Sequence, residues 1–146
     1  MYRLAFAANA NQEDVIVGLA RVLLEQKKDE EASDFLDRIG SSGEFGPEAD
    51  KLRAILWLRN QAKGLPSDEE LRKKPKDAQA LCDLGCVLAA NGKIEESLET
   101  LLQAGRLDRK LASAKVRETM VKIFFIIGVR SEMADAYRDK LTALLY

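Results

Sequence analysis

Apolar residues recur three and four positions apart along this chain of 146 residues, and strand-like alternation of apolar and polar residues is absent. Such spacing gathers apolar side chains on one face of an α-helix. Glycine and proline divide the periodic stretches into pairs. We therefore predict an all-α fold of about four helix pairs, at residues 13–40, 47–74, 77–108 and 111–146.

The second pair is expected to be degenerate. Pro66 stops its long first helix, and Pro75 leaves room for only a short second helix that starts at the N-cap residue Ser67. The four pairs are expected to form a single domain over residues 13–146. Residues 1–12 form an N-terminal segment outside that domain.

The first and third pairs are similar to each other at an offset of 65 residues. This offset places Leu23 on Leu88, Lys28 on Lys93, and Leu36 on Leu101. It is close to two units of a repeat of about 34 residues. The pattern therefore favours a solenoid, in which helix pairs stack along one direction, over a simple bundle.

The third pair resembles a tetratricopeptide repeat (TPR). That repeat asks for large apolar, small and turn residues at fixed positions, which this sequence fills with Leu81, Leu84, Gly85, Leu88, Gly92, Ser97, Leu101 and Ala104. Gly85 and Ser97 would be small because the two helices cross closely there. The chain departs from the pattern at Arg109, where proline is usual, and at Lys27, which replaces the turn glycine of the first pair.

A broader resemblance covers roughly residues 13 to 146. The stretches LLQAGRLDR, KVRETMVKIFFIIG and YRDKL are similar to the C-terminal region of the chaperedoxin (YbbN-type) family, bacterial proteins in which a thioredoxin-like domain precedes a degenerate TPR region. The thioredoxin-like domain is not in this sequence, so the chain is either a fragment of a longer protein or a stand-alone version. The resemblance implies a cytoplasmic co-chaperone that hands unfolded or oxidation-damaged clients to chaperone machines.

The only two cysteines, Cys82 and Cys86, are four residues apart and would lie on one face of a helix. A thioredoxin-type site needs CxxC at a helix start, and a zinc site needs ligands that a chain without histidine and further cysteine does not supply. We expect small, inert, packed residues. Contact with a partner and thiol-dependent redox chemistry are the alternatives.

Other catalytic patterns are weak. The absence of histidine removes the usual triads and most proton shuttles, and the glycine-rich GSSGEFG lacks the lysine of a phosphate-binding loop. We predict neither an enzyme nor a cofactor.

Partner binding is the remaining function. The inner positions of the third pair are occupied by Gln79, Cys82, Asp83 and Cys86, which differ from the basic residues that bind a C-terminal carboxylate in some TPR proteins. A second candidate surface is locally basic and comprises Arg106, Arg109, Lys110, Lys115, Arg117 and Lys122. The alternative for these six residues is an ordinary solvated face.

Charge and hydropathy exclude two partner classes. Lysine and arginine (23) nearly balance aspartate and glutamate (24), so no global field would attract nucleic acid. The longest apolar run, IFFII, is too short to cross a bilayer. We predict a cytoplasmic protein-interaction module, and the resemblance to the chaperedoxin family implies that it binds chaperone machinery or unfolded clients. A structural module that forms a homodimer is the alternative.

Overall fold

The computed structural model describes residues 13–39 and 46–146, and every secondary-structure element in these two ranges is helical. The prediction of an all-α fold built from helix pairs is confirmed. The predicted N-terminal segment, residues 1–12, and most of the glycine-rich loop lie outside the described residues. The chain divides into two compact units, Met1–Leu56 and Trp57–Tyr146. That residues 13–146 form one domain stays a prediction.

The first unit contains a helical hairpin. Helices α2 (Glu13–Glu25) and α3 (Asp29–Leu36) pack against each other. Their core is aliphatic, with Leu23 of α2 and Leu36 of α3 almost fully buried. The first part of α4 (Gly46–Ala62) adds further apolar residues to this core.

The turns of the first and third pairs have the same hydrogen bonds. The Lys28 amide donates to the Leu23 carbonyl oxygen (2.8 Å), and the Lys93 amide donates to the Leu88 carbonyl oxygen (2.9 Å). This bond closes a helix end whose turn residue has positive φ. In the third pair that residue is Gly92, with φ +84°. In the first pair it is Lys27, with φ +60°.

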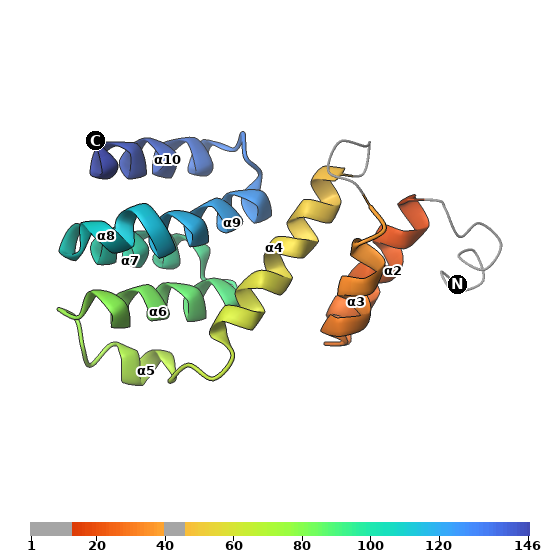
Figure 1. Cartoon of the computed structure of the whole chain (residues 1–146), viewed down its shortest axis with the longest axis horizontal. Helices are drawn as coiled ribbons and strands as arrows, with labels where there is room; N and C mark the ends of the chain where they lie inside the picture. Colours follow the sequence, from red (N-terminus) through yellow and green to blue (C-terminus); the bar gives the residue numbers. More distant parts are fainter. Residues whose placement is uncertain (1–12, 40–45) are drawn as a thin grey trace. The chain divides into compact units, whose positions relative to one another are not determined.

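The second unit contains the remaining helices. They are α5 (Asp68–Leu71), α6 (Ala78–Ala90), α7 (Ile94–Leu107), α8 (Arg109–Leu111), the π-helical turn η1 (Ala112–Val116), α9 (Arg117–Ile127) and α10 (Glu132–Leu145). Figure 1 shows α5 beside α6, with α9 and α10 following on the other side of α6. Helix α7 packs against α6, η1 and α10. The second pair is reduced as predicted, because α5 has only four residues.

Two predicted capping residues start two helices of this unit, α5 and α6. Asp77 accepts hydrogen bonds from the Gln79 and Ala80 amides at the start of α6, and Ser67 accepts one from the Glu70 amide at the start of α5. Side-chain acceptors of this kind satisfy amides that have no partner within the helix. The two caps fix where α5 and α6 begin, and the candidate site described below lies between these two helices.

Candidate functional site

The four predicted inner residues of α6 separate into two groups. Gln79 is exposed and Asp83 is half-buried, and the Gln79 side-chain amide donates to the Asp83 carboxylate (Nε2 to Oδ1, 3.0 Å). Cys82 and Cys86 are buried, with 0% and 1% of their surface exposed. Only the first group therefore presents polar atoms at the surface.

Helix α9 contacts the Cys86 thiol. The Cys86 sulfur lies 3.9 Å from the Thr119 hydroxyl oxygen of α9, and Thr119 itself is fully buried. Burial raises the pKa of the Cys82 thiol to about 12, with smaller contributions from Cys86 and Asp83. Burial likewise raises the pKa of Cys86. Both groups are therefore neutral thiols near pH 7, and neither can contact a partner while the fold is intact.

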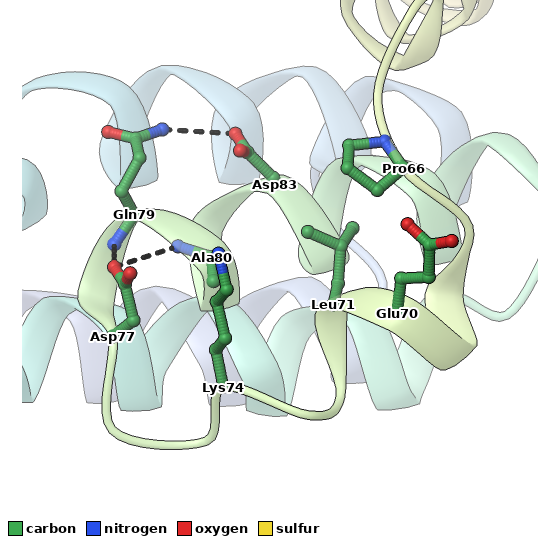
Figure 2. A pocket seen from close by; sticks show the side chains of 8 residues that line it. All are labelled: Pro66, Glu70, Leu71, Lys74, Asp77, Gln79, Ala80 and Asp83. Atoms are coloured by element: carbon green, nitrogen blue, oxygen red, sulfur yellow. Dashed lines mark hydrogen bonds between the residues drawn. The ribbon is translucent and has the colours of Figure 1, made fainter.

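A pocket of about 260 Å³ opens between α5 and the start of α6. Figure 2 shows the side chains that line it. They are Pro66, Glu70, Leu71 and Lys74 from the α5 segment, and Asp77, Gln79, Ala80 and Asp83 from the α6 segment. Two of the predicted inner residues, Gln79 and Asp83, thus line a real concavity.

Two different surfaces meet in this pocket. Leu71 and Ala80 are buried side chains, so the base is apolar. Three carboxylates and one ammonium group stand around it, which leaves a net negative lining. The Glu70 carboxylate takes part in no hydrogen bond or ion pair with the described part of the chain.

The predicted basic surface also divides. Lys115 and Lys122 are half-buried, and their ammonium nitrogens lie 4.7 Å and 5.7 Å from the ring centroid of Trp57, the only tryptophan. Lys115 also donates to the Gln61 side-chain oxygen. These two lysines therefore contact other residues of the same unit, and their charges are not free for a partner. The other predicted basic side chains are exposed on α7, α8 and α9: Arg106, Arg109, Lys110 and Arg117.

Sequence reasoning missed the contribution of α5 to the pocket. Its N-cap was recognisable at Ser67, but a degenerate helix occupies no repeat position from which Glu70 and Leu71 could be assigned to a site. Trp57 was also missed as the partner of Lys115, since no local pattern connects residues so far apart in the chain.

No helix in residues 13–39 and 46–146 combines the length and the apolar character that crossing a membrane requires. Within the same residues, no group of three or more cysteine, aspartate or glutamate side chains is placed to hold a metal ion.

Comparison with protein families gives matches over most of the chain. Two family models, each described as a tetratricopeptide repeat, match residues 63–146 and residues 1–56. No curated protein matches the chain.

Proposed function

The chain belongs to the tetratricopeptide repeat family, and from this premise we propose that it is a non-catalytic module that binds proteins by surface complementarity. Stacked helix pairs offer extended surfaces, and binding is their common use. The observation that carries the proposal is the pocket between α5 and α6, because inner residues of the third pair line it. The two thiols of the second unit are buried and neutral, so they offer no reactive thiolate at its surface.

The proposed partners are chaperone machinery and unfolded client proteins of the bacterial cytoplasm. Support comes from the resemblance of LLQAGRLDR, KVRETMVKIFFIIG and YRDKL to the chaperedoxin family. In this role the chain would hold a client or dock on a chaperone, and any redox step would belong to a thioredoxin-like domain that this sequence does not contain.

The test is capture from a bacterial lysate at low salt, with the whole chain immobilised and followed by binding measurements with purified chaperonin. We expect saturable binding of the chaperonin or of a chemically unfolded model enzyme, and no binding of the same enzyme when it is folded. Failure to bind either one would contradict the co-chaperone role.

Self-association is the second candidate function. The observation that favours it is the exposure of two apolar side chains near the start of α10, Val129 (44%) and Met133 (37%), which a second copy could cover. Light scattering over a dilution series separates the two candidates. The average molar mass of a homodimer falls on dilution as it dissociates, and that of a monomeric adaptor does not change.

A further inference from the structure

The base of the pocket suits an aliphatic chain. Leu71 and Ala80 retain only 5% and 6% of their surface, and Pro66 adds an apolar ring at the edge. Figure 2 shows the Leu71 side chain between Pro66 and Asp83. Because Leu71 and Ala80 are already almost fully covered, an unbranched chain of methylene groups laid here would mainly remove its own apolar surface and the exposed Pro66 ring from water.

The rim of the pocket suits a cation. The Asp77 carboxylate is already occupied, because one of its oxygens caps two amides of α6. The Asp83 carboxylate accepts one hydrogen bond, from Gln79, and the Glu70 carboxylate accepts none within the described residues. Figure 2 shows Glu70 and Asp83 on opposite sides of Leu71. Two carboxylates with free acceptor oxygens therefore flank the apolar base.

The size of the pocket favours a side chain over a free ligand. Its volume of about 260 Å³ lies below the range of about 300 to 1,000 Å³ that is usual for small-molecule sites. A metal ion is also disfavoured, because the described residues hold no suitable group of three acidic or thiol ligands. An apolar stem with a positive head is the chemistry of lysine and arginine, which lay their stems on apolar surface and keep the charge at the rim.

We propose that this pocket receives a lysine or arginine side chain from a basic segment of the partner protein. This inference rests on the proposed protein-binding function. The stem lies over Leu71 and Ala80, and the cationic head lies between Glu70 and Asp83. Lys74 supplies the only positive charge of the lining, and a bound side chain displaces it. The negative lining repels the phosphates of a nucleic acid.

The test is a titration of the ¹⁵N-labelled whole chain, followed by amide chemical shifts. The probes are two capped peptides of equal length, one with lysine and one with norleucine at the same positions. We expect the lysine peptide to shift the amides of Leu71, Ala80 and Asp83, and the norleucine peptide to bind at least threefold more weakly. Added salt should weaken only the lysine peptide.

Variants locate the charge. Glu70→Gln and Asp83→Asn keep the shape of the pocket, and each should weaken the lysine peptide about threefold to tenfold. The matched control is Glu69→Gln, because Glu69 is an exposed neighbour that does not line the pocket. Lys74→Met removes the internal cation and should strengthen binding about twofold to threefold. It still tests the proposal if one of the acidic-residue variants fails to fold.

Equal binding of the two peptides would overturn the proposal, as would equal effects of Glu70→Gln and Glu69→Gln. Pocket shifts caused by an acidic peptide or a short RNA in place of the lysine peptide would also overturn it. If the unaltered chain does not bind the lysine peptide, and Asp83→Asn still captures chaperone or client, the pocket proposal fails and the protein-binding function stands. If the lysine peptide binds but no chaperone or client is captured, the pocket proposal stands and the proposed chaperone or client binding fails.

Discussion

The Ser97 hydroxyl donates a 2.6 Å hydrogen bond to the Gly85 carbonyl oxygen, so that a side chain of α7 is joined to the backbone of α6. Both residues are buried at this crossing. A Cβ atom on Gly85 would lie 2.5 Å from Cγ of Leu101, well inside van der Waals contact. The small residues that the repeat pattern placed here are therefore required by the approach of the two helices.

We expect Gly85→Ala to lower the free energy of unfolding by about 1 to 3 kcal/mol, because Leu101 is fully buried and has little room to move. Urea unfolding measures the change. In the double variant with Leu101→Ala the clash disappears, so the two effects should not add. Additive losses would show that Gly85 does not meet Leu101.

Lys27 has φ +60° at the position where the third pair has Gly92. Positive φ costs a non-glycine residue about 1 to 2 kcal/mol. Replacing that residue by glycine removes this cost, but part of the gain is lost because glycine gives the unfolded chain more conformational freedom. We expect Lys27→Gly to raise the free energy of unfolding by about 0.5 to 1 kcal/mol, measured by circular dichroism in urea.

The matched control for Lys27→Gly is Gly92→Ala, which should lower the free energy of unfolding by about 1 kcal/mol. A Cβ on Gly92 meets nothing within 4 Å, so this loss would come from the backbone alone. A neutral result at both positions would mean that the two turns tolerate either residue.

The buried thiols predict a loss of stability in alkali. The pKa of Cys82 rises from its ordinary 9.0 to about 12 in the fold. The neutral thiol therefore stabilises the fold fully below about pH 9, and this contribution is lost as the pH rises toward the folded pKa, at up to about 1.4 kcal/mol per pH unit. Urea unfolding at about pH 8 and about pH 10.5 should show a smaller decline for Cys82→Ala than for the unaltered chain.

Tyr137 also has a raised pKa, because of burial and its hydrogen bond to Glu99. Tyr137 is present in the unaltered chain and in Cys82→Ala, so the difference between their pH slopes comes from the Cys82 thiol. The same burial predicts that a thiol reagent near pH 8 reacts with both cysteines only when the second unit unfolds. Fast labelling of the folded chain, or parallel pH slopes for the two chains, would contradict the burial of Cys82.

Lys115 should stabilise the second unit through Trp57 and Gln61. We expect Lys115→Ala to cost about 0.5 to 2 kcal/mol and to change the tryptophan fluorescence, because an ammonium group over an indole contributes in this range. The control is Lys110→Ala, since the Lys110 side chain is exposed, and its effect should stay within about 0.5 kcal/mol. Similar changes in both variants would argue against a role for the indole.

The parts of the fold that could be predicted depend on local chemistry. Asp77 and Ser67 start helices because their side chains reach amides two or three residues away, and Gly92 and Gly128 adopt the positive φ that turns require. Helix periodicity and these end signals were enough to predict an all-α fold of paired helices. The similarity of the first and third turns was visible because each is closed by its own short segment.

The candidate site could be predicted only in part, because its contacts join distant segments. Whether Cys86 is covered depends on Thr119, which lies 33 residues further along the chain. The π-helical turn Ala112–Val116 changes which side chains of the following helix share a face. No residue type in the sequence predicts such a turn. The pocket depends on where α5 lies, so Gln79 and Asp83 were predicted without Glu70 and Leu71.

The sole tryptophan and both cysteines fall in the unit that begins at Trp57. Thiol labelling is therefore a natural reporter of that unit. Trp57 follows directly after Leu56 of the first core on α4, so its fluorescence reports neither on the second unit alone nor on the hairpin around Lys27 alone. A tryptophan introduced at Phe35, which is half-buried beside the first core, would give that hairpin its own optical signal. The order in which the two units lose structure could then be followed within a single sample.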